Sequence, residues 1–81
     1  MVARTMILWR RTKLRVLRRL VEHGEPWLFG SVLIAEKILS RWSAFVVLGD
    51  MESDELIEGR PDSVSGRRCY RITEKGRLGA T

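Results

Sequence analysis

The side chains best placed to do chemistry in this sequence are arginines, which make up twelve of its 15 basic residues. Those of most interest are Arg15, Arg18 and Arg19 near the N-terminus, Arg41 in the middle, and Arg60, Arg67, Arg68 and Arg71 near the C-terminus. A guanidinium group can donate two parallel hydrogen bonds to a phosphate or to the edge of a guanine base. The arginines therefore favour binding of a polyanion, although a GC-rich genome would also raise the arginine content.

Patterns typical of catalysis or of metal binding are absent from the sequence. With one histidine and one cysteine, His23 and Cys69, the chain cannot supply the four ligands of a structural zinc site or form an internal disulfide. Ser43 has no nearby His or Asp that would make it nucleophilic, and no Gly-rich loop precedes a helix. We expect no enzyme, no cofactor, no metal and no small-molecule effector. Cys69 is either an inert half-buried thiol or, between its arginines, a redox-sensitive one.

Length and composition indicate one folded domain. The chain has 81 residues, of which 44 % are hydrophobic and 31 % charged, a balance typical of globular proteins rather than disordered tails. Its apolar stretches, such as residues 6–9 and 32–35, are far shorter than the ~20 residues that span a bilayer or the ~7–15 of a secretory signal. We therefore expect a cytoplasmic protein, or one of the host cytoplasm if a phage encodes it, with no membrane partner.

Charge is distributed unevenly around a net value of +5. Residues 1–23 and 59–81 are mainly basic, whereas residues 24–58 carry seven acidic side chains and two basic ones. Two basic ends suit a polyanion held from two sides, because each phosphate contact releases counterions. The alternative is that the ends are merely solvated or form ion pairs with the acidic middle.

Apolar spacing predicts three helices. The first covers residues 12–23, capped by Thr12, with Leu14, Leu17, Leu20 and Val21 as its apolar stripe. The second starts at Glu25 and Pro26 and ends near residues 38–40. The third runs from a cap at Ser40 to about residue 54, and its predicted buried side is Ala44, Phe45, Leu48, Met51 and, as an additional candidate, Val47.

After the third predicted helix, the spacing of the apolar residues changes from that of a helix to that of extended strands. Residues 56–60 and the alternating residues 67–73 predict two strands, joined by a loop at 61–66 that is rich in turn-forming residues. Beyond them we expect at most one further turn. Three helices followed by a two-stranded β-hairpin predict an α+β fold, the winged helix-turn-helix, over residues 12–77. Residues 1–11 would form an N-terminal arm that covers the core or pairs with a second copy, and residues 78–81 a short tail.

Two stretches resemble PadR-like winged-helix regulators and the broader MarR-like group. Residues 40–48 and 51–58 are similar to that family's recognition-helix stretch, with an opening serine and an aromatic residue at Phe45. Residues 66–77, an arginine-rich strand that ends in Thr-Glu-Lys-Gly-Arg, resemble the second wing strand and the turn after it. The resemblance covers most of residues 12–77 and implies a DNA-binding transcriptional regulator.

The chain departs from the family pattern in three places. The solvent side of the third helix offers Trp42, Ser43, Val46, Gly49 and Asp50, which is hardly a basic surface for reading DNA. Glu55 stands where the family has a glycine after the third helix, so a left-handed helix cap there would be strained or absent. The family's C-terminal dimerisation helix would begin where this chain ends, so the resemblance is to a truncated form without that helix. A homodimer therefore stays open, and palindromic recognition by the family's dimer is not implied.

The winged-helix plan assigns a role to each candidate residue. The first turns of the third helix would contact base edges or phosphates through Arg41, Trp42, Ser43 and Val46. The wing would contact phosphates or the minor groove through Arg60, Arg67, Arg68 and Arg71, and the first helix would cross the backbone with Arg15, Arg18 and Arg19. Against this, Trp42 would pack on the domain, Arg68 would lie over the core, and the other arginines would be solvated.

We therefore expect a small regulator that binds double-stranded DNA in a sequence-specific manner without a cofactor, of a size that suits a phage or mobile element. Three alternatives remain open at this point. One is a winged-helix adaptor for protein–protein interaction, and another is an excisionase-like architectural DNA-binding protein. An RNA-binding role is the weakest, since Trp42 alone offers an aromatic surface on which bases could stack.

Overall fold

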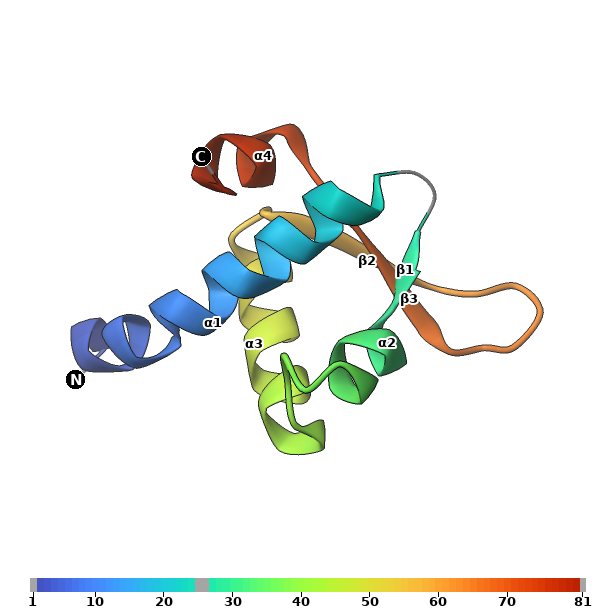
Figure 1. Ribbon diagram of the computed structural model, residues 1–81, viewed down its shortest axis with the longest axis horizontal. Helices are drawn as coiled ribbons and strands as arrows, with labels where there is room; N and C mark the ends of the chain where they lie inside the picture. Colours follow the sequence, from blue (N-terminus) through green and yellow to red (C-terminus); the bar gives the residue numbers. More distant parts are fainter. Residues whose placement is uncertain (1, 25–26, 81) are drawn as a thin grey trace.

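The computed structural model describes residues 2–24 and 27–80, and the side chains from residue 10 onward. These residues form four helices and one three-stranded antiparallel sheet, an α+β arrangement (Figure 1). The elements are α1 (Val2–His23), β1 (Leu28–Phe29), α2 (Gly30–Ala35), α3 (Arg41–Ser53), β2 (Ile57–Pro61), β3 (Arg68–Ile72) and α4 (Glu74–Ala80). The expected class is confirmed, with one strand and one helix more than the sequence predicts.

Helix α1 begins at Val2, so the predicted start at Thr12 is wrong. Residues 2–11 contain neither Gly nor Pro, and nothing in them interrupts a helix. The face of α1 that is buried carries Val16, Leu17 and Leu20, whereas Val21 is exposed. The hypothesis that residues 6–9 cover the core or pair with a second copy concerns side chains outside the described part of the chain.

Strand β1 was not predicted, and it takes the place of the expected start of the second helix. Leu28 pairs with Tyr70 and Phe29 with Cys69 on β3. The helix begins only at Gly30 and ends at Ala35, and the predicted start at residues 25–26 lies outside the described residues. Two residues hold no local strand signal, so this strand exists because a distant segment supplies its hydrogen-bond partners.

Helix α3 starts and ends close to the predicted positions. Ser40 is its N-cap in a capping box: the Ser40 hydroxyl accepts from the Ser43 N–H (3.1 Å) and the Ser43 hydroxyl from the Ser40 N–H (2.8 Å). Its core face is formed by Ala44, Val47, Leu48 and Met51.

Phe45 is not part of this core face, which corrects the prediction. Its side chain is 86 % exposed. Successive residues are about 100° apart around a helix, so position 45 lies beyond the edge of the arc that Ala44, Val47 and Met51 bury.

The β-hairpin is confirmed to within a residue at each strand end. Strands β2 and β3 pair in antiparallel register from Ile57↔Ile72 to Pro61↔Arg68, and β1 pairs with the other edge of β3. Ile57, Tyr70 and Ile72 contribute to one core with the buried side chains of α1, α2 and α3.

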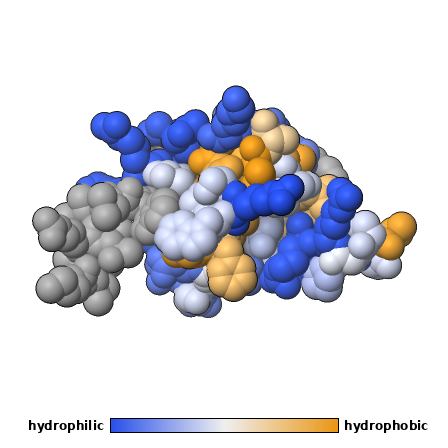
Figure 2. All heavy atoms as spheres, turned by 90° about the horizontal axis from the view of Figure 1, so that it is seen from below, coloured by the Kyte–Doolittle hydropathy of each residue, from blue (hydrophilic) through white to orange (hydrophobic). Residues whose placement is uncertain are grey.

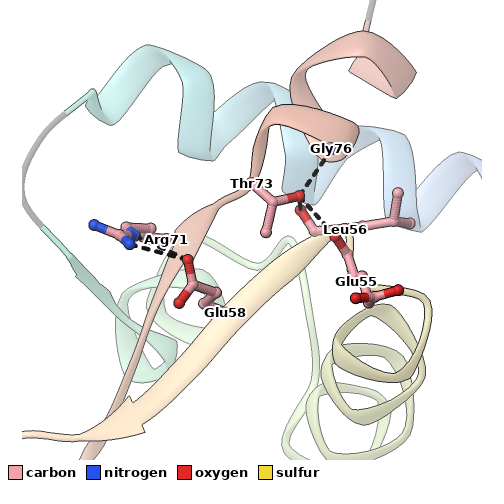
Figure 3. A network of polar contacts seen from close by, with 6 residues as sticks. All are labelled: Glu55, Leu56, Glu58, Arg71, Thr73 and Gly76. Carbon is pink, nitrogen blue, oxygen red and sulfur yellow. Dashed lines mark hydrogen bonds and ion pairs between the residues drawn. The ribbon is translucent and has the colours of Figure 1, made fainter.

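Helix α4 follows the hairpin directly, where the sequence predicts no more than a turn and a tail. It packs against α1 and β3 (Figure 1). Thr73 joins it to the end of α3: its hydroxyl donates to the Glu55 carbonyl (2.7 Å) and accepts from the Gly76 N–H (3.0 Å) (Figure 3). A Cβ at Gly76 would lie 2.1 Å from the Leu56 carbonyl oxygen, so this approach requires glycine.

Glu55 adopts the left-handed backbone conformation that favours glycine, with φ +62°. Replacement by glycine relieves this strain, but it also increases the conformational entropy of the unfolded chain, which partly offsets the gain. We expect Glu55→Gly to increase the free energy of unfolding by about 0.5–1 kcal/mol. Urea denaturation measures it. Glu55→Ala is the control, because alanine removes the carboxylate and keeps the Cβ; an equal gain in both variants would contradict the explanation.

Gly76→Ala is expected to destabilise the fold by about 1–3 kcal/mol, because the new methyl group overlaps backbone atoms. Gly79→Ala is the matched control on the same helix. A Cβ there meets only Leu17 Cδ1, at an ordinary 3.8 Å, and alanine is the better helix former. In thermal unfolding, Gly76→Ala alone should have a lower midpoint temperature than the wild type. Equal midpoints for the two variants would contradict the close approach of α4.

Candidate nucleic-acid interface

A groove of about 350 Å³ opens between α2, the first half of α3 and the start of β3. Its lining includes Arg41 and Phe45 from α3 and Arg67 and Arg68 from the hairpin. Seen from below the orientation of Figure 1, this side of the molecule shows hydrophobic atoms among hydrophilic ones (Figure 2). The fold thus joins two of the three arginine groups of the sequence at one opening.

Local structure explains how α3 presents its side chains to this groove. The cap at Ser40 sets the start of the helix, and Arg41 and Phe45 then fall one turn apart on the same face. Trp42, beside them on the helix, is 70 % exposed, so most of its side chain is accessible. Ser43 is buried, with its hydroxyl in the capping box, and Val46 is half-buried. Of the four candidates on α3, Arg41 and Trp42 are therefore the accessible ones.

Three candidate arginines are held by carboxylates of the acidic middle segment. Arg19 Nε lies 2.7 Å from Glu36, Arg68 Nη2 3.1 Å from Glu52, and Arg71 Nη2 3.0 Å from Glu58 (Figure 3 shows the last). Lys13 pairs with Asp50 in the same way. Internal pairing, one of the alternatives that the charge pattern leaves open, thus accounts for part of the basic surface.

The ion pair between Arg19 and Glu36 also shifts the pKa values of both side chains. The hydrogen bond from Arg19 lowers the pKa of Glu36 below its ordinary value and raises the pKa of Arg19. Both groups are exposed, where such pairs contribute little to stability. In this structure the Arg19 guanidinium is directed toward Glu36.

The remaining candidates differ in position. In the described part of the chain, no carboxylate lies within ion-pairing distance of Arg15, Arg18, Arg41, Arg60 or Arg67. Arg41 and Arg67 line the groove, whereas Arg18 lines a separate opening between α1 and α4 with Arg77. The structure does not bring Arg18 to the groove.

Trp27 contacts two of the candidate arginines, and sequence reasoning missed this contact. The Cζ atoms of Arg60 and Arg71 lie 4.1 Å and 4.9 Å from the centroid of its ring, in cation–π geometry. Trp27 precedes β1, and its place over the hairpin follows from the pairing of β1 with β3, for which the sequence has no local signal. Beneath this layer Cys69 is buried, and its thiol donates to the Arg60 carbonyl (3.4 Å).

Asp62 organises the loop between β2 and β3. Its carboxylate accepts hydrogen bonds from the Ser65 N–H (2.9 Å), the Ser65 hydroxyl (3.1 Å) and the Val64 N–H (3.2 Å). The Asp62 N–H donates to the Arg67 carbonyl (2.7 Å), so the loop fixes the backbone of the groove arginine. The bonds from Ser65, the backbone one first, hold the pKa of Asp62 below its ordinary 3.8.

The described residues offer no group of three or more His, Cys, Asp or Glu side chains that could hold a metal ion. In the same part of the chain no helix is both long and apolar enough to cross a membrane. The groove itself presents two guanidinium groups without a carboxylate partner among the described residues, one paired guanidinium and an exposed aromatic ring.

Comparisons with protein-family models, with curated proteins and with solved structures find no match for this chain.

A pH titration followed by NMR tests the loop. The pKa of Asp62 is expected below 3.8, so the loop's hydrogen bonds persist above that pH and are lost as the pH falls through the lowered pKa. Ser65→Ala removes one donor and should move the pKa toward 3.8. Ser63→Ala is the control in the same loop, and an equal shift in both variants would contradict the assignment.

Proposed function

We propose that this protein binds duplex DNA as a winged helix, with α3 in the major groove and the β2–β3 hairpin as a wing along the backbone. The observation that carries the proposal is the groove at which Arg41 of α3 meets Arg67 of the hairpin, neither of them paired with a carboxylate of the described residues. A helix of this size fits the major groove, and guanidinium groups on either side of it suit phosphates or guanine edges.

The order of the elements supports the same proposal. A helix, a short strand, two helices and a hairpin are compatible with a winged helix, and the resemblance to PadR-like regulators lies in the same α3 and hairpin residues. Three ion-paired arginines, Arg19, Arg68 and Arg71, contribute less than the charge pattern predicts. The residues proposed to contact DNA are thus Arg41 and Arg67, together with Arg60, whose guanidinium lies over the Trp27 ring.

Binding of this kind suits a small regulator that acts by occupying a site, and it also suits an excisionase-like architectural role. Sequence specificity would come from the side chains of α3, because phosphate contacts carry no base information. A second copy of the chain remains a candidate partner on DNA.

Fluorescence anisotropy of labelled mixed-sequence duplexes, titrated at several salt concentrations, tests the proposal. Wild-type affinity should fall as salt rises, as expected when several phosphates are neutralised. Arg41→Glu and Arg67→Glu should each weaken binding by about tenfold or more and reduce the log–log salt slope by about one unit.

Arg18→Glu is the matched control, an equal charge reversal at an exposed arginine outside the groove. It should change the affinity far less than the two groove variants. Equal weakening by all three reversals would mean non-specific attraction, and no binding at low salt would overturn the proposal.

A second candidate, a protein-interaction adaptor, is favoured by a different opening of about 600 Å³, which lies between the end of α3, β2 and the start of α4. Its lining includes Glu52, Glu55, Glu58 and Glu74, a surface that repels phosphate and suits a basic partner protein. The groove variants discriminate between the candidates. Arg41→Glu and Arg67→Glu weaken DNA binding if DNA is the partner, and they leave binding of a basic protein unchanged if the acidic opening is the site.

A further inference from the structure

The most exposed aromatic side chain among those described lies in the proposed DNA groove rather than away from it. Phe45 is 86 % exposed and lines the opening with Arg41 and Arg67. Trp42, three residues earlier and also exposed, lies next to it on the helix surface. The first two turns of α3 therefore present an aromatic pair together with a cation.

The backbone fixes this presentation. The capping box at Ser40 and Ser43 sets where α3 begins, and the buried arc of Ala44, Val47 and Met51 sets its rotation. With both fixed, Phe45 cannot turn into the core without exposing one of these residues. Arg41 lies one turn toward the N-terminus on the same face. A partner that approaches this face thus meets an apolar ring and a guanidinium about one helical turn apart.

We propose that Phe45 reads the C5-methyl groups of thymines in the major groove, an inference that rests on the DNA-binding function proposed above. Thymine is the only base with a methyl group at the major-groove edge, and apolar side chains contact it. Phenylalanine has no hydrogen-bond donor or acceptor to satisfy the polar edges of the other bases. Phe45 then selects A·T pairs, while Arg41 contacts a guanine or a phosphate one turn away.

The charges around the ring favour an anionic partner. Arg41, Arg67 and Arg68 line the same opening, and Glu52, which pairs with Arg68, lines the acidic opening instead. An apolar ring between cations fits a duplex better than an apolar protein surface, because phosphates flank every major-groove methyl group.

Replacement of thymine by deoxyuridine provides the test, because it removes only the methyl group. The same labelled duplexes are prepared with thymine or with deoxyuridine throughout and titrated by anisotropy. The wild-type protein should bind the thymine duplexes about fourfold more tightly for each methyl group in contact. Phe45→Ala should bind both sets equally, and Phe45→Leu, which keeps an apolar side chain, should retain a preference for thymine.

Leu78→Ala is the matched control, since Leu78 is also an exposed apolar residue but lies on α4. Leu78→Ala should keep the wild-type ratio of affinities for the thymine and deoxyuridine duplexes. Salt-dependent binding with equal affinity for both duplex sets would overturn this inference and leave the proposed function standing. Tighter binding to single strands than to duplexes would also overturn it, since the ring would then stack on unpaired bases. No binding to any of these probes would overturn the proposed function itself.

Discussion

Strand β3 is the element on which the rest of this structure depends. It is hydrogen-bonded on both sides, to β1 and to β2, and its Tyr70 and Ile72 enter the core. At its start it places Arg68 beside α3, and just after its end Thr73 binds the end of α3 and the backbone of α4. Strand β2 pairs along the whole of β3, whereas β1 pairs with Cys69 and Tyr70 alone. The groove, the hairpin and the C-terminal helix therefore share β3 as a common support.

Electrostatic pairing within the fold decides how much of the basic surface is available. The acidic middle of the chain lies against both basic ends, and Glu36, Glu52 and Glu58 each take one arginine. Exposed pairs of this kind add little stability, but they reduce the positive potential over α1 and the sheet. Arg41 and Arg67 at the groove have no carboxylate partner among the described residues, so the proposed interface is smaller than the charge pattern suggests.

Sequence reasoning located the elements whose signals are local. The Ser40 cap, the apolar spacing of α3 and the alternation of residues 67–73 were sufficient for α3 and the hairpin, because caps and periodicity act within a few residues. The same reasoning placed Phe45 in the core, since a phenylalanine at the edge of an apolar stripe cannot be assigned until the rotation of the helix is known. For the groove, the sequence supplied the candidate arginines but did not indicate that Arg41, Arg67 and Arg68 lie at the same opening.

The sequence by itself determined that the chain folds as one small α+β unit with a net positive charge and an arginine-rich hairpin, because composition, periodicity and turn residues are properties of neighbouring positions. Tertiary structure decided the rest. The existence of β1, the stacking of Arg60 and Arg71 on Trp27, the docking of α4 at Gly76 and the exposure of Phe45 all depend on contacts between segments far apart in the chain. Such contacts leave no pattern in the neighbouring sequence, because each of the residues involved could lie in many different surroundings. Only the packing of the whole core decides which surroundings it has.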